Sequence, residues 1–120
     1  MSLLVYGAAS LFHHVHNAEF LGEYPNMPGW LTPARVYAAW LAVTVVGLAG
    51  YLLFRSGYRL AGLAVLGAYG ALGLYGLAHY AVAPMSSYTV TMHLTIGLEA
   101  VTASMLLITV VLEWFRLRPS

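Results

Sequence analysis

The chain has 120 residues, of which 61% are hydrophobic and 8% are charged, and its formal net charge is +1. Soluble domains carry about 25% charged residues, so one soluble core could not bury this much apolar surface, and we expect lipid as the solvent. No basic patch is present to follow phosphates, which argues against nucleic acid as a partner. The absence of cysteine excludes disulfides and thiolate metal ligands.

Four hydrophobic stretches follow one another, at about 2–24, 33–54, 60–82 and 87–116. Each has roughly the 20 residues that cross a bilayer. The first lacks the basic start and the cleavage site of a signal peptide, so we interpret it as a retained helix. Thr32 and Pro33 are typical of an N-cap followed by proline at the first helical position. The sequence therefore predicts one all-α domain over 1–120, an up-down bundle of four transmembrane helices.

The arginines predict the orientation of this bundle. Arg55 and Arg59 lie between the second and third helices, and Arg116 and Arg118 follow the fourth, whereas Arg35 alone lies on the other side. The positive-inside rule then places both termini in the cytoplasm and the loops 25–32 and 83–87 outside.

Histidines and glutamates gather at the outward-facing ends of three predicted helices. Glu99 lies deeper, where a bare carboxylate costs about 2.5–3.5 kcal/mol, so it should be protonated, paired or bound to a ligand. At about 100° per residue His14 points away from His13, and we leave it outside the predicted site. The predicted site comprises His13, His16, His79 and His93 as metal ligands, with Glu19 and Glu99 as catalytic groups.

Imidazole nitrogen and carboxylate oxygen suit a divalent zinc, iron, copper or manganese ion. Without a metal, the same groups could act as acid and base. The alternative for any single histidine near a helix end is a hydrogen bond to a backbone carbonyl.

Glycines recur at every third position of the third predicted helix, at Gly67, Gly70, Gly73 and Gly76. Small residues let membrane helices approach closely, which is the simpler interpretation. The alternative is that Gly76, one turn before His79, clears space for a flat or bulky ligand.

The run His16-Asn17-Ala18-Glu19-Phe20, followed by Pro28-Gly29-Trp30, resembles the opening motif of the HXXEE-domain proteins, with Phe20 in place of the second glutamate. The resemblance implies a compact helical protein of the bacterial inner (plasma) membrane with an unassigned enzymatic activity. Of the functional residues of that family, the motif matches only His16 and Glu19 in this sequence.

Three function classes follow. The first is a metal-dependent or acid–base membrane enzyme with an outward-facing pocket that acts on a small or lipid-like substrate. The second is an accessory subunit of a larger membrane complex (respiratory, photosynthetic or monooxygenase), with membrane lipid and other subunits as partners. The third is a carrier of haem b, with one axial histidine from the first helix and another from the third or fourth.

Overall fold

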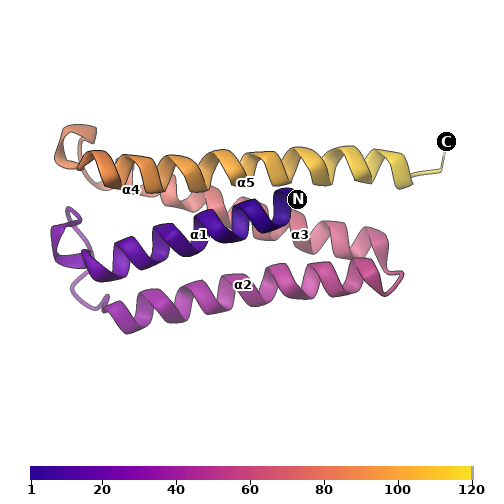
Figure 1. Cartoon of the computed structure of the whole chain (residues 1–120), viewed down its shortest axis with the longest axis horizontal. Coiled ribbons are helices and arrows are strands. Elements are labelled where there is room, and N and C mark those ends of the chain that lie inside the picture. Colours follow the sequence, from indigo (N-terminus) through magenta and orange to yellow (C-terminus); the bar gives the residue numbers. More distant parts are fainter. Residues whose placement is uncertain (120) are drawn as a thin grey trace.

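The computed structural model describes residues 1–119, and within this range every regular element is a helix (Figure 1). This confirms the all-α prediction. The long helices are α1 (Ser2–Glu19), α2 (Pro33–Arg55), α3 (Arg59–Leu74) and α5 (Val90–Leu117). The short elements are η1 (Leu21–Glu23), η2 (Tyr75–Ala78), α4 (His79–Val82) and η3 (Met85–Ser87).

Three helical stretches are long and apolar enough to cross a membrane: Pro33–Arg55, Arg59–Val82 and Val90–Leu117. The last three of the four predicted spans thus keep their places, and the third of the four consists of α3, η2 and α4 in succession. Helix α1 has 18 residues, which at 1.5 Å per residue is about 27 Å and only just matches the hydrocarbon core. A fourth span through α1, and with it the four-span bundle, stays a prediction.

The helix ends differ in detail from the prediction. The first helix ends at Glu19 rather than near residue 24, because Phe20 leaves the helical conformation at φ −113°. Thr32 caps α2 as predicted, accepting a hydrogen bond from the Arg35 amide at 3.3 Å. Helix α5 begins at Val90, a few residues later than predicted, where Thr89 accepts from the Met92 amide.

Small residues bring the helices of the bundle together. A methyl group added to Gly73 would lie 2.5 Å from a ring carbon of Tyr6 in α1 and 2.7 Å from Cβ of Ala103 in α5. Tyr6 and Ala103 are both fully buried and belong to the main apolar core. The glycine run of α3 therefore serves close packing at this position, as its simpler interpretation predicts.

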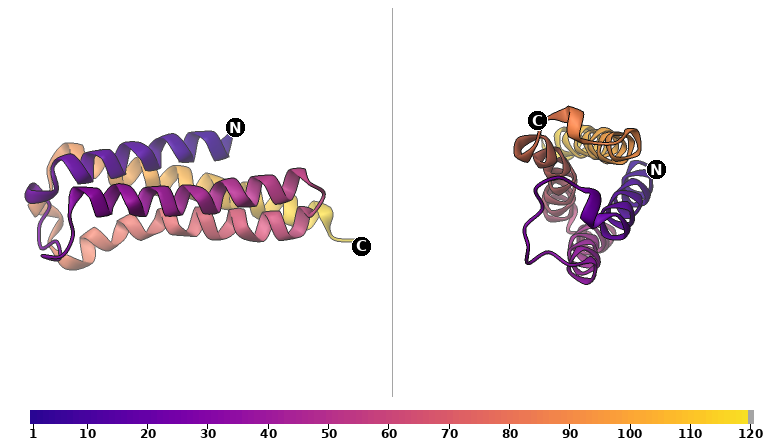
Figure 2. Two further views of the ribbon diagram at one scale, coloured as in Figure 1. Left: turned by 90° about the horizontal axis from the view of Figure 1, so that it is seen from below. Right: turned by 90° about the vertical axis from the view of Figure 1, so that its left-hand side faces the viewer.

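The two ends of the bundle differ in the loops, the terminus and the arginines that they carry. The α2–α3 turn, in which Gly57 takes φ +95°, lies at the same end as the C-terminus. The loops after α1 and before α5 lie at the other end, and α1 starts part-way along the bundle (Figures 1 and 2). Arg55, Arg59, Arg116 and Arg118 thus share one end, which is the distribution on which the predicted orientation depends.

Candidate metal centre

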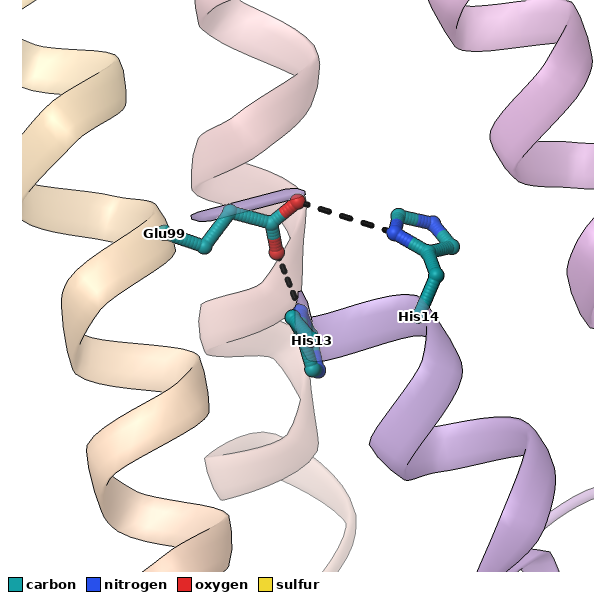
Figure 3. A group of neighbouring side chains, drawn as sticks. All are labelled: His13, His14 and Glu99. Atoms are coloured by element: carbon teal, nitrogen blue, oxygen red, sulfur yellow. Dashed lines mark hydrogen bonds and ion pairs between the residues drawn. The ribbon is translucent and has the colours of Figure 1, made fainter. Parts of the chain in front are cut away.

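A buried carboxylate from α5 lies between two consecutive histidines of α1 (Figure 3). Glu99 is 2% exposed and His13 is 5% exposed. His13 Nδ1 donates a hydrogen bond to Glu99 Oε2, and His14 Nδ1 lies 3.8 Å from Glu99 Oε1. Each carboxylate oxygen therefore faces a different imidazole. This pairing is what a carboxylate in an apolar interior requires.

His13, His14 and Glu99 form a group that could hold a metal ion. One ligand atom from each residue lies within 4.8 Å of the others. The donors are nitrogen and oxygen only, which suits zinc, iron, copper or manganese without selecting one of them. The prediction of a metal site is thus supported by a His/Glu group that could hold an ion, and the identity of the metal stays a prediction.

A third histidine lies beside this group. The ring of His79 has its centroid 5.6 Å from that of His13. Its Nε2 contacts the side-chain amide nitrogen of Asn17 at 3.2 Å. His79 is the first residue of α4, so the 3₁₀ segment η2 that precedes it fixes its position relative to α1. The structure thereby brings His79 next to His13.

Three buried polar atoms in this region have no hydrogen-bond partner: His13 Nε2, His79 Nδ1 and Asn17 Oδ1. Leaving a buried donor or acceptor unpaired costs about 1–3 kcal/mol. Three such atoms close together are the pattern of a site that is completed by a bound ion or ligand. This observation is independent of the His13–Glu99 contact.

Gly76 provides the space in which the pair lies. A methyl group at this residue would lie 3.1 Å from Glu99 Oε2 and 3.1 Å from His13 Cε1. Both distances are shorter than ordinary van der Waals contact. The histidine and the glutamate of the group therefore lie against Gly76, which also lines the adjoining cavity.

A cavity of about 450 Å³ adjoins the group, and His13, His14, Asn17, His79 and Glu99 line it. The other walls come from α2, from η2 and α4, and from the loop between α1 and α2. This volume lies within the range of about 300–1,000 Å³ that is typical of small-molecule sites.

One residue fixes the loop over this cavity. Asn26 has a left-handed conformation, with φ 55°, which asparagine tolerates better than most residues. Its side-chain amide donates a hydrogen bond to the carbonyl oxygen of Val82 at 2.8 Å. The loop is thereby attached to the end of α4.

His16 and Glu19, both residues of the predicted site, have separate partners. His16 Nδ1 hydrogen-bonds the Tyr24 hydroxyl at 2.9 Å, and its ring stacks on Phe20. Burial raises the pKa of Tyr24, which keeps its phenol protonated. Glu19 accepts a hydrogen bond from Tyr37 at 2.6 Å. Both predicted site residues therefore lie outside the His13–Glu99 group.

His93 also lies outside the group. Its Nδ1 hydrogen-bonds the Tyr80 hydroxyl at 2.6 Å, and its Nε2 donates to the carbonyl oxygen of Met85 at 3.1 Å. Its ring stacks on Tyr80 with centroids 5.5 Å apart. With both nitrogens engaged, His93 has the backbone-bonded role that is the alternative for a single histidine near a helix end.

His14 is the member of the group that sequence reasoning missed. A helical wheel places it about 100° from His13, on another face. The Glu99 side chain lies between the two rings, so residues on adjacent faces both reach it (Figure 3). His14 Nδ1 also donates to the Ser10 carbonyl at 2.8 Å, which fixes the ring against its own helix.

Comparison with known proteins finds no matching family model, no matching curated protein and no matching solved structure. The resemblance to HXXEE-domain proteins therefore stays a prediction.

Proposed function

We propose that this chain is a membrane protein that binds one divalent transition-metal ion through His13, His14 and Glu99, with His79 as a further donor. The observation that carries the proposal is the convergence of three ligand atoms within 4.8 Å in a buried position. The unpartnered His13 Nε2 supports it: because Nδ1 donates to Glu99, Nε2 carries the lone pair of the neutral ring, and such a nitrogen is a common metal ligand.

We further propose that the centre belongs to a membrane enzyme. A metal ion held there would supply a Lewis acid beside the adjoining cavity. Glu99 fixes the orientation of the His13 ring, and most of the cavity wall beside it is apolar. The reaction class that this arrangement suits is a polar transformation of a small molecule bound in the cavity.

A metal-free acid–base site is the second candidate, and the direct His13–Glu99 hydrogen bond favours it. In that function the two groups would share the proton that the reaction moves, as a histidine and a carboxylate commonly do in general acid–base catalysis. The unpartnered His13 Nε2 would face the substrate.

Metal analysis of the purified protein separates these candidates. The chain is produced without a polyhistidine tag, purified in detergent, stripped with chelator and titrated with Zn²⁺, Mn²⁺, Fe²⁺ and Cu²⁺. The metal function predicts about one equivalent bound per chain. His14→Ala and Glu99→Gln should each weaken binding at least tenfold, since each removes a ligand from a small set.

His93→Ala is the matched control, because His93 lies on α5 like Glu99 but contacts Tyr80 and Met85 instead. It should bind metal as the wild type does. Absence of stoichiometric binding with all four metals would refute the metal function and leave the acid–base candidate. An equal loss in His93→Ala would show that binding is not specific to this group. A Soret band in the purified protein would indicate haem instead.

A further inference from the structure

The residues that line the cavity beside the His13–Glu99 group indicate the chemical class of ligand that it could bind. Along α2 the lining residues are Val36, Ala39 and Val43, and Leu72 and Val82 contribute from α3 and α4. These walls offer apolar surface and no hydrogen bond. Most of a ligand in this space would therefore be hydrocarbon, and its size is limited by about 450 Å³.

The polar part of the lining offers an acceptor in a defined place. Asn17 is 8% exposed and lines the cavity, and its Oδ1 has no partner. An amide oxygen accepts hydrogen bonds and cannot donate them, so a ligand that satisfies it must carry an O–H or N–H group. His13 Nε2 and His79 Nδ1, also unpartnered, come from two further lining residues.

The charges around the cavity disfavour an anionic ligand. Among the described residues that line it there is no arginine, and the chain has no lysine. Glu99 is the acidic residue of the lining, and it is engaged by His13 and His14. In the metal-free protein a carboxylate ligand would lack a side-chain cation and would bring no donor for Asn17.

We propose that this cavity binds a neutral, mainly aliphatic alcohol, with its hydroxyl group donating to Asn17 Oδ1 and its carbon chain along the apolar wall of α2. The lone pairs of the hydroxyl oxygen then remain free for the metal ion. In this last contact the inference rests on the proposed function, whereas the cavity and the Asn17 acceptor do not require a metal.

The loop between α1 and α2 gives such a ligand a route to the surface. Trp30 lines the cavity and is nevertheless 64% exposed, so this wall extends from the cavity to the outside. Ala39 also lines the cavity, and it too is exposed. The cavity is therefore open to the outside both at this loop and along α2.

Quenching of Trp30 fluorescence by a brominated alcohol tests this inference. Trp40→Phe and Trp114→Phe leave Trp30 as the reporter, and the protein is reconstituted in nanodiscs with and without Zn²⁺. The probe is 11-bromo-1-undecanol, compared with 11-bromoundecanoic acid and with 1-bromoundecane. We expect saturable quenching by the alcohol, at least tenfold weaker binding of the acid in the absence of Zn²⁺, and non-saturable quenching by the bromoalkane.

Ala39→Phe fills the cavity from an exposed position and should abolish the saturable phase. Ala38→Phe is its matched control, because Ala38 is the neighbouring exposed alanine and does not line the cavity. Asn17→Leu should weaken the alcohol at least tenfold and leave the bromoalkane unchanged. The comparison of Ala39→Phe with Ala38→Phe does not depend on whether Asn17→Leu folds.

Equal binding of acid and alcohol in the absence of Zn²⁺, or saturable quenching that survives Ala39→Phe, would overturn the inference. If the protein binds Zn²⁺ but shows no saturable quenching, the inference is wrong and the metal function stands. If saturable quenching occurs in a protein that binds no metal, the metal function is wrong and the alcohol site stands.

Discussion

Gly76→Ala tests whether the His13–Glu99 pair forms the metal site. The added methyl would lie 3.1 Å from Glu99 Oε2 and 3.1 Å from His13 Cε1. Ordinary contact begins near 3.4 Å, so both groups must move by a few tenths of an ångström. The side chains of a binding site tolerate displacements of only about 0.5 Å, and mutations beside metal ligands weaken the affinity for the metal by about 10–100-fold. We expect a loss in this range, which is about 1.4–2.7 kcal/mol.

The measurement is a competition titration of Zn²⁺ between the purified protein and a fluorescent chelator. Gly67→Ala is the control on the same helix, since its methyl would make an ordinary 3.6 Å contact with Val110 Cγ1. Thermal unfolding in detergent establishes that both variants are folded. Zinc affinity in Gly76→Ala within twofold of the wild type would refute the assignment of this pair as ligands.

Three further predictions concern the fold. Gly73→Ala should lower the free energy of unfolding by about 1–3 kcal/mol, because its methyl would lie 2.5 Å from the nearest side chain of a neighbouring helix. Gly67→Ala should change this free energy little, and denaturant titration measures both variants. Asn26→Ala should cost about 1–2 kcal/mol, because it loses the bond to Val82 at a left-handed φ, and hydrogen exchange should then rise in residues 24–31 alone. Burial raises the pKa of Tyr24 above the usual value of 10, so its phenol should ionise at a higher pH than that of a free tyrosine. Ionisation therefore favours the unfolded chain, and the free energy of unfolding should fall as the pH rises above about 10. This fall should be smaller in Tyr24→Phe.

The all-helical membrane class could be predicted from composition, because the composition of the whole chain indicates whether its surface faces water or lipid. An apolar content of 61% with so few charges is incompatible with a soluble core of 120 residues. Local chemistry fixed some boundaries as well, since Thr32 and Pro33 specify a helix start wherever the helix then packs. The predicted end of the first helix was wrong because Phe20 to Tyr24 are apolar enough to continue a helix, and tertiary contacts such as that of Tyr24 with His16 decide otherwise.

The members of the site were only partly predictable. His13, His79 and Glu99, three residues of the predicted site, lie near one another, and each carries polar groups that an apolar environment makes costly. Their depth along the helices follows from the sequence. The rotation of each helix about its own axis does not, since it depends on which side chains of other helices fill the space beside it.

His14 and His93 show what this rotation decides. Glu99 is long enough to lie between two adjacent faces of α1, so His14 belongs to the group although a helical wheel separates it from His13. His93, six residues before Glu99 on the same helix, turns toward Tyr80 and the backbone near Met85. The sequence by itself determined that titratable groups must be paired within an apolar helical protein. The tertiary structure decided which groups pair, because helix rotation and the space beside Gly76 set the contacts of each side chain.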